Sequence, residues 1–397
     1  MKKNKKTFID LFAGCGGLSE GFYKQGYEAL AHVEINHHAC ETLKTRMKHY
    51  GYKNVNQSVL EINITDKSVL KKLEEIVNGK EVDIVIGGPP CQSFSSLGRA
   101  KDEHGMSNDP RNYLFESYVN ILNKFKPRAF VFENVTGLLS AKINNELIIK
   151  KILKKLGEKY TVIYDPKIMV LNSADYGVPQ IRKRVIIIGI RKDLKTSPEI
   201  VYKSIKKTHC DPELNKENNL KDFVTVKEAI SDLPKIKSGM GNKEIKFVSK
   251  SENEFLKQVR SKNEILLSDH VARTQNEADT ERFKLMSKNK WTFQELLINR
   301  PDLNHAKQRV FNNSYVVQFW NKPSRTIIAH LYKDGNQFIH PDHNQSRSIT
   351  PREAARLQSF PDNFIFEGSR TEIYKQIGNA VPPLFAEAIA KAIKNIL

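Results

Sequence analysis

The sequence of 397 residues lacks any apolar run approaching the roughly 20 residues of a membrane-spanning helix. Its basic N-terminus is followed by an apolar segment, residues 8–12, that is too short and too acidic for a signal peptide. No internal repeat or low-complexity tract is present. We therefore expect a cytoplasmic protein with no membrane partner.

Cysteine is also scarce, and none is paired in sequence. The four cysteines are Cys15, Cys40, Cys91 and Cys210. Their wide spacing contains no CxxC pair, which argues against a zinc site or a redox couple. We expect reduced thiols and no bound metal, although a single cysteine can still act as a nucleophile.

Positive charge, in contrast, is abundant. Lysine and arginine number 64 against 45 acidic residues, which gives a net charge of +19. Such an excess favours a polyanionic partner, with nucleic acid as the natural candidate. A lysine-rich proteome would produce the same balance, and the excess is spread along the chain rather than gathered in one tail.

The first half of the chain alternates short apolar runs with helical patterns. This alternation predicts an α/β fold with a mostly parallel sheet and helices on both faces. Strands are expected at residues 7–12, 28–34, 55–60, 82–86, 129–133, 161–170 and 185–190. A helix is expected over 67–77 behind Asp66 as its N-cap, and the last two strands could form an antiparallel edge.

Beyond residue 192 the sequence becomes polar and irregular, which indicates a second, smaller domain with long loops. Clear patterning returns where Thr350 is expected to cap a helix that begins with Pro351. An amphipathic helix over 384–397 closes the chain.

The most informative segment is GGPPCQSFS at residues 87–95, which directly follows the apolar run 82–86. Glycine permits unusual backbone angles and proline fixes φ, so Cys91 is predicted to stand on a stiff loop at a strand's carboxyl end. Ligands of open α/β sheets bind at that edge. An isolated cysteine in a tight turn is more often structural than reactive, so the residues around Cys91 must show which role it has.

Polar residues gather at the ends of the other predicted strands. A glycine-rich turn, residues 12–18, opens a helix after the first strand, and Glu34 ends the second. Glu133 ends the strand at 129–133, and Arg182 and Arg184 alternate with their neighbours before the last strand. Each feature alone is equally compatible with a structural role.

Taken together, six ordered motifs resemble the cytosine-C5 DNA methyltransferase family. They are DLFAGCGG (10–17), GPPCQ (88–92), ENV (133–135), QIRKR (180–184), REAARLQSFPD (352–362) and QIGNAVPP (376–383). The resemblance implies a Rossmann-like S-adenosylmethionine-dependent methyltransferase sheet with a smaller, irregular DNA-recognition domain. Residues 1–192 and 373–397 would form the catalytic domain, and 193–372 the recognition domain.

The resemblance also implies a set of cofactor-binding residues around S-adenosylmethionine. They are Phe12, Gly14, Gly16, Gly17, Glu34, Ile35, Asn63, Ile64, Pro90, Leu114, Asn379 and Val381. Asn63 stands where the family usually has an acidic residue, and Glu61 or Asp66 is the alternative at that position.

The family mechanism would give Cys91 the attack on C6 of a cytosine flipped out of double-stranded DNA. Glu133 would bond N3 and the exocyclic amine, Arg182 would hold the O2 carbonyl, and Arg184 would support the loop. Ser95 and the loop through residue 111 would close over the base, and Thr326 would lie at the end of the DNA-binding region.

The resemblance further implies a monomeric enzyme of a restriction-modification system, with any partner endonuclease acting separately. Two alternatives remain. The chain could methylate transfer RNA, as some close relatives of the family do, or it could be a catalytically silent DNA-binding relative.

Overall fold

The computed structural model describes residues 5–90, 113–143, 145–214, 219–246, 252–260, 266–304 and 314–396.

The chain divides into two compact units. The first comprises Met1–Tyr176, Lys183–Lys207 and Val381–Leu397, and the second comprises Gly177–Arg182 and Thr208–Ala380. The first unit thus extends to 207 rather than to the expected 192. The second unit keeps residues 373–380, which were expected in the catalytic domain.

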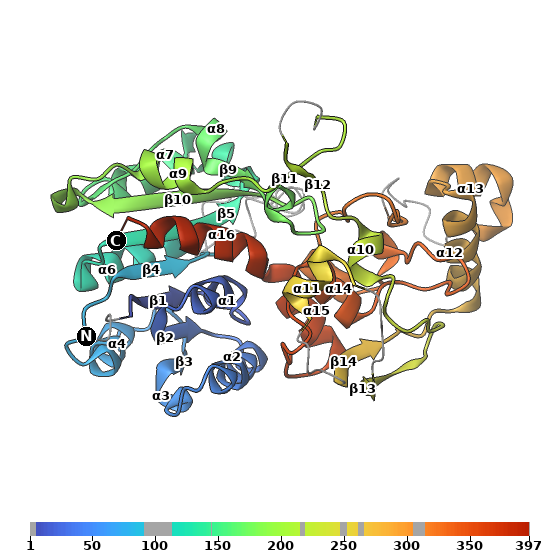
Figure 1. Cartoon of the computed structure of the whole chain (residues 1–397), viewed down its shortest axis with the longest axis horizontal. Coiled ribbons are helices and arrows are strands. Elements are labelled where there is room, and N and C mark those ends of the chain that lie inside the picture. The colour runs from blue at the N-terminus through green and yellow to red at the C-terminus, as the bar shows by residue number, and fades with distance from the viewer. Residues whose placement is uncertain are drawn as a thin grey trace. The chain divides into compact units, whose positions relative to one another are not determined.

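An eight-stranded sheet forms the centre of the first unit (Figure 1). Its order is β3-β2-β1-β4-β5-β10-β8, with β9 paired to β10. The strands are β1 (Thr7–Leu11), β2 (Glu28–Glu34), β3 (Val59–Glu61), β4 (Ile84–Gly87), β5 (Ala129–Val135), β8 (Tyr160–Thr161), β9 (Val170–Asn172) and β10 (Lys183–Arg191). Strands β3, β2, β1, β4 and β5 run parallel to one another. Strand β10 is antiparallel to β5, β8 and β9. The predicted mostly parallel α/β fold is confirmed.

Helices connect these strands in the alternating order that the sequence predicted. They are α1 (Gly17–Lys24), α2 (His37–His49), α3 (Val55–Ser58), α4 (Val69–Val77), α6 (Leu114–Phe125), α7 (Ile148–Leu156), α8 (Pro166–Met169), α9 (Pro198–Ser204) and α16 (Pro383–Lys394). A short hairpin, β6 (Lys142–Ile143) and β7 (Glu146–Leu147), precedes α7. Every residue of β4 and all but the first of β1 are buried, so both faces of the sheet are covered.

Three elements differ from those predicted, and side-chain capping bonds accompany two of these differences. The expected strand 161–170 is interrupted because Asp165 accepts a hydrogen bond from the Lys167 amide and Pro166 starts α8. Residues 55–58 form α3, so the edge strand β3 begins only at Val59. Asp66 caps the turn before α4 through the amide and hydroxyl of Ser68, and the helix begins at Val69.

The C-terminal helix completes the first unit, as expected. Helix α16 lies against α1, far from it in sequence (Figure 1). A Cβ at Gly21 would lie 2.3 Å from the backbone carbon of Ala386 and the nitrogen of Glu387. Glycine is therefore needed for α1 and α16 to approach this closely.

The second unit contains short helices and strand pairs around two buried centres. Its elements are β11 (His209–Cys210), β12 (Lys221–Asp222), α10 (Val226–Ile230), β13 (Gly241–Lys246), α11 (Glu254–Val259), β14 (Leu266–Val271), α12 (Glu277–Asn289), α13 (Phe293–Asn299), α14 (Pro351–Leu357) and α15 (Arg370–Asn379). One centre is apolar and joins α12 and α13 to the chain around Tyr315 and Ile339.

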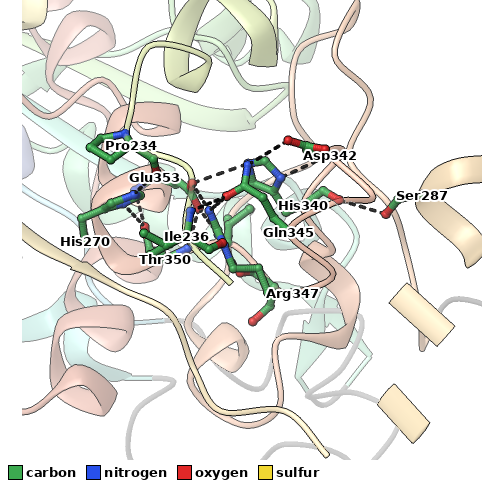
Figure 2. A network of polar contacts seen from close by, with 12 residues as sticks. Pro234, Ile236, His270, Ser287, His340, Asp342, Gln345, Arg347, Thr350 and Glu353 are labelled. Carbon is green, nitrogen blue, oxygen red and sulfur yellow. Dashed lines mark hydrogen bonds and ion pairs between the residues drawn. The ribbon is translucent and has the colours of Figure 1, made fainter. Parts of the chain in front are cut away.

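The other centre is a buried polar network around α14 (Figure 2). Arg347 donates to both carboxylate oxygens of Glu353 at 2.7 Å, and Thr350 and Glu353 form a capping box at the start of α14. Arg347 also donates to the carbonyl of Ile236, and His270 of β14 bonds the Thr350 hydroxyl. The network therefore ties α14 to β14 and to the segment before β13, and the predicted cap at Thr350 is confirmed.

The contact between α1 and α16 yields a stability prediction. Gly21→Ala should destabilise the first unit by about 2 kcal/mol, because the added methyl group overpacks against α16 backbone. Thermal unfolding measured by circular dichroism tests this. Lys391→Ala, at an exposed position of α16, is the control and should leave the midpoint unchanged; equal midpoints for both variants would contradict the predicted clash.

The polar network yields a prediction for pH. Burial lowers the pKa of His340 to about 4, although Glu353 lies 3.5 Å away and opposes the shift. The unfolded chain, in which a histidine has a pKa near 6.5, takes up a proton before the folded chain does. The contribution of His340 to the free energy of unfolding is therefore complete above that pH and is lost as the pH falls toward 4. The expected loss between pH 7 and pH 5 is about 2 kcal/mol.

Denaturant unfolding followed by tryptophan fluorescence can measure this loss, since both tryptophans, Trp291 and Trp320, belong to the second unit. His340→Gln should flatten the pH dependence between pH 7 and pH 5. His330→Gln, at an exposed histidine, should leave it as in the unmodified protein. A pH dependence that is unchanged in His340→Gln would contradict the assignment.

Candidate active site

The carboxyl ends of the parallel strands bring the predicted site residues of the first unit to one edge of the sheet. The glycine-rich turn follows β1, Glu34 ends β2, Gly87 ends β4, and Glu133 lies near the end of β5. Loops at this edge of an open α/β sheet form its ligand site. The strand order places β1 between β2 and β4, so the turn after β1 lies centrally.

The glycine-rich turn has the backbone geometry that its sequence predicted. Phe12, Gly14 and Gly16 have φ values of 57°, 54° and 89°, and α1 begins directly afterwards at Gly17. A Cβ at Gly14 would meet nothing within 4 Å, whereas one at Gly16 would lie 2.7 Å from the Leu43 side chain. Open space therefore adjoins the turn at Gly14, while Gly16 packs against α2.

Glu34 fastens this turn to the end of β2. Its Oε2 accepts a hydrogen bond from the Gly14 amide at 2.8 Å. Its Oε1 accepts bonds from the amides of Ile35 and Asn36 at 2.9 and 2.8 Å. The Ile35 side chain is 64% exposed beside it, so an apolar surface and a fixed carboxylate adjoin the open space.

The three candidates for the contact with adenine, at the end of β3 and just after it, all form local hydrogen bonds. Asn63 accepts from the amide and hydroxyl of Thr65, Glu61 bonds His37, and Asp66 bonds Ser68. Ile64 beside them is buried.

Glu61 also belongs to a surface group in which His37, Glu41 and Glu61 place one ligand atom each within 4.8 Å of one another. The absence of a metal therefore stays a prediction.

Sequence reasoning missed a buried polar group beneath the turn. Asp10 of β1 accepts a hydrogen bond of 2.6 Å from Ser19 of α1, and Ser19 also lies 3.1 Å from the His32 ring. Burial raises the pKa of Asp10 to about 8, with the Ser19 bond opposing the shift. The signal in the sequence that could have revealed this group was a carboxyl side chain within the apolar strand at 7–11.

A second missed residue, Asn134, holds the turn that leads to Cys91. Its buried Nδ2 donates to the Pro89 carbonyl at 3.1 Å, and its Oδ1 accepts from the Val135 amide at 2.8 Å. A Cβ at Gly88 would lie 2.7 Å from Oε2 of Glu133, so this turn packs closely against the end of β5. Pro90 is partly exposed.

Cys91 and Ser95 lie outside the described residues, as does the loop through residue 111 that was expected to close over the base. The description resumes at residue 113, and Leu114 begins α6.

Glu133 is paired with Arg184. The Arg184 Nε lies 3.0 Å from Oε1 of Glu133, and the two side chains are only 12% and 13% exposed. Burial lowers the pKa of Arg184, while the neighbouring Glu133 charge favours its cationic form. The antiparallel pairing of β10 with β5 brings the two residues together, because Arg184 is in register with Val135.

Arg182 and Thr326 belong to the second unit. Arg182 is fully buried and donates to the carbonyls of Ile327 and Gly378 at 2.8 and 3.3 Å. The Thr326 hydroxyl donates to the carbonyl of Ile181 at 2.7 Å. Sequence reasoning gave Arg182 the substrate contact and Arg184 a supporting role, whereas the structure pairs Arg184 with Glu133 and gives Arg182 backbone contacts.

The last two predicted cofactor residues fall on either side of the division between the units. Asn379 ends α15 in the second unit and is exposed. Val381 begins the returning segment of the first unit and is buried.

The α/β sheet, with its glycine-rich turn and a glutamate and arginine beside a proline-fixed loop, defines a methyltransferase of the cytosine-C5 class. A model of the C-5 cytosine-specific DNA methylase family matches residues 6–395. The chain therefore belongs to this family and is a DNA (cytosine-5) methyltransferase, a class that requires a methyl donor.

Individual proteins agree with the family assignment. The Type II methyltransferase M.Bpa9945I of Bacillus paralicheniformis is 34% identical over 98% of both chains. The Type II methyltransferase M.DdeI of Desulfomicrobium norvegicum is 35% identical over 98% of this chain and 88% of its own. An E. coli prophage protein assigned as a DNA modification methyltransferase has a similar solved structure, with a TM-score of 0.71 and 26% identity over 99% of both chains.

No described helix is long and apolar enough to cross a membrane.

The contact of Asn134 with Pro89 predicts that the amide is needed for both stability and activity. Asn134→Asp replaces the Nδ2 donor with an oxygen facing the Pro89 carbonyl, which should cost about 2 kcal/mol. Methyl transfer to DNA should fall at least tenfold, with the loss in kcat. Asn145→Asp, at an exposed turn, is the matched control; similar activities for both variants would contradict this role.

Proposed function

We propose that the chain transfers a methyl group from S-adenosylmethionine to C5 of a specific cytosine in double-stranded DNA, through a covalent bond between Cys91 and C6. The observation that carries this proposal is the pair of Glu133 and Arg184, packed against the turn at 87–89 that leads into Cys91. The pair places a carboxyl group and a cation beside the turn that precedes the proposed nucleophile.

The residues at the carboxyl edge fit S-adenosylmethionine. The space beside Gly14 admits a ligand close to the backbone, and Glu34 fixes a carboxylate where ribose hydroxyl groups can be bound. Exposed Ile35 offers an apolar surface for an adenine ring. When bound, S-adenosylmethionine supplies an electrophilic methyl group.

Among the cysteines, Cys91 is the proposed nucleophile. A thiolate is the reactive form of cysteine, and burial raises the pKa of both Cys15 and Cys40 to about 12. These two thiols therefore stay protonated at neutral pH. Cys91 comes two residues after Pro89, whose carbonyl accepts a hydrogen bond from Asn134.

The proposed reaction begins when the Cys91 thiolate adds to C6 of the cytosine. The electrons of the C5–C6 double bond become available at C5, and the Glu133 carboxyl group supplies a proton to N3. When C5 takes the methyl group, the bond from that methyl group to the sulfonium sulfur breaks and S-adenosylhomocysteine leaves. Water then removes the C5 proton, the bond from Sγ to C6 breaks and N3 returns its proton to Glu133, which restores the aromatic ring and the thiolate.

The cytosine must leave the DNA stack to reach these groups, so the proposal includes base flipping. We assign the contact with the developing negative charge at O2 to Arg184, because its guanidinium lies beside Glu133. Arg182 keeps a positioning role, since it donates to the backbone carbonyls of Ile327 and Gly378 in the second unit. This exchanges the roles that sequence reasoning gave the two arginines.

The second unit, which includes Thr326, would select the DNA sequence. The family and the Type II names of the relatives support DNA rather than transfer RNA as the substrate and favour a restriction-modification role. A monomeric state and a separately acting endonuclease stay predictions.

A trapping experiment tests the chemistry without knowledge of the recognition sequence. In the presence of S-adenosylmethionine, plasmid DNA in which cytosine is replaced by 5-fluorocytosine should form a complex with the protein that survives SDS, because fluorine at the methylated C5 cannot leave as a proton does. Cys91→Ala should abolish both this complex and the transfer of labelled methyl groups to ordinary plasmid DNA. Cys210→Ala, at a partly exposed cysteine of the second unit, is the control and should retain both.

Two results would overturn the proposal. An SDS-stable complex in Cys91→Ala would refute the nucleophile, and labelling of transfer RNA but not of DNA would refute the substrate. Bisulfite sequencing of DNA from expressing cells would then identify the methylated sequence.

A further inference from the structure

Helix α7 of the first unit carries a one-sided array of lysines. Five side chains, Ile148, Ile149, Ile152, Leu153 and Leu156, are buried against the unit. The other four residues of the helix are the exposed Lys150, Lys151, Lys154 and Lys155. The surrounding segment, residues 142–159, holds six lysines and two glutamates, a net charge of +4 over 18 residues.

The lysines of α7 suit the helix that carries them only in part. Lys154 and Lys155 lie in the last turn, where the helix dipole favours a cation. Lys150 lies in the first turn, where the helix dipole disfavours a cation and where α7 has no acidic residue. Lys150 and Lys154, like Lys151 and Lys155, form like-charge pairs at i,i+4, which repel each other. Burial of the apolar face therefore holds the helix together against its own charge.

Helix α4 of the same unit shows that this charge is not required by the architecture. It also has nine residues, with Lys71 and Lys72 at exposed positions followed by the exposed Glu74 and Glu75. Its outer face is therefore neutral, whereas every exposed residue of α7 is a lysine.

Four lysines of this segment have no ion-pair partner among the described residues, namely Lys142, Lys150, Lys154 and Lys159. Lys151 and Lys155 form exposed pairs with Glu116 and Glu158 at 3.4 and 3.5 Å, and such pairs are weak. The patch formed by Lys142, Lys150, Lys151, Lys154 and Lys155, here called the α7 patch, therefore retains most of its charge.

The α7 patch begins close to the candidate active site. Strand β5, which carries Glu133, leads through residues 136–139 and the β6–β7 hairpin with Lys142 into α7. Helix α7 contacts residues 136–139, and β8, which follows it, pairs with the end of β10 opposite Ala129. The lysines therefore extend from the carboxyl edge of the sheet toward its amino edge.

We propose that the α7 patch binds the phosphate backbone of DNA that flanks the methylated site, independently of base sequence. A lysine array that fills every exposed position of α7 and extends from the catalytic edge fits a polyanion of regularly spaced charges. DNA is the polyanion that this family modifies. The inference goes beyond the proposed reaction, since it concerns binding and does not depend on Cys91.

The salt dependence of binding to a 30-base-pair duplex of mixed sequence, measured by fluorescence anisotropy, tests the patch on the full-length protein. Each phosphate contact contributes about 0.9 to the slope of log K against log salt. The triple variant Lys142→Gln, Lys150→Gln, Lys154→Gln should lower the slope by about 2 to 3 and the affinity at 0.1 M salt at least about tenfold. Its thermal midpoint should stay equal or rise, because like-charge repulsion is removed.

The matched control removes the same charge from the other helix. Lys67→Gln, Lys71→Gln, Lys72→Gln changes three exposed lysines at α4 and should leave the slope within about 0.5 of the unmodified protein. A slope that the α7 variant leaves unchanged overturns the proposal. Equal reductions in both variants also overturn it, since they would reflect net charge alone. Neither outcome bears on the trapping experiment with 5-fluorocytosine, so failure of the patch and failure of the proposed reaction are distinguishable.

Discussion

The site depends on the carboxyl end of β5, where two neighbouring residues hold two different elements. Successive side chains of a strand point to opposite faces, so Glu133 and Asn134 turn away from each other. Glu133 pairs with Arg184 of β10, and Asn134 bonds the Pro89 carbonyl. One strand end thereby fixes both the acid–cation pair and the turn that leads to the proposed nucleophile, and the rest of the sheet serves to place that strand end.

Buried charge organises the second unit in a comparable way. Several arginines in and just before the motif at 352–362 are enclosed and bonded to carboxylates or backbone carbonyls rather than directed at a ligand. Arg356 pairs with Asp362 and Asp232, and Arg347 pairs with Glu353. Removing one partner of such a pair leaves an uncompensated buried charge, so these motif residues are restricted by folding. The motif at 352–362 therefore combines a structural role with its value as a family signature.

The two units differ in what holds them together. The first relies on an apolar sheet and on the close contact of α1 with α16, which joins the two ends of the chain. The second has an apolar centre around α12 and α13 and a buried polar network around α14. Surface charge differs again, since every exposed residue of α7 in the first unit is a lysine.

The sequence by itself determined the alternating α/β order, the strand that delivers the turn at 87–90, the position of Glu133 and the closing helix, because these follow from local periodicity and from the special backbone of glycine and proline. It also placed Thr350 as a cap, since a capping box is a local pattern. It could not distinguish Arg182 from Arg184, because both alternate identically along the chain.

Only the tertiary structure decided between the two arginines. The register of β10 on β5 brings Arg184 to Glu133, whereas residues 177–182 join the second unit, where Arg182 is buried. The roles of Asp10 and Asn134, and the need for glycine at 21, likewise arise from contacts between segments far apart in sequence. Such contacts depend on packing and register across the whole sheet, which no local pattern of residues encodes.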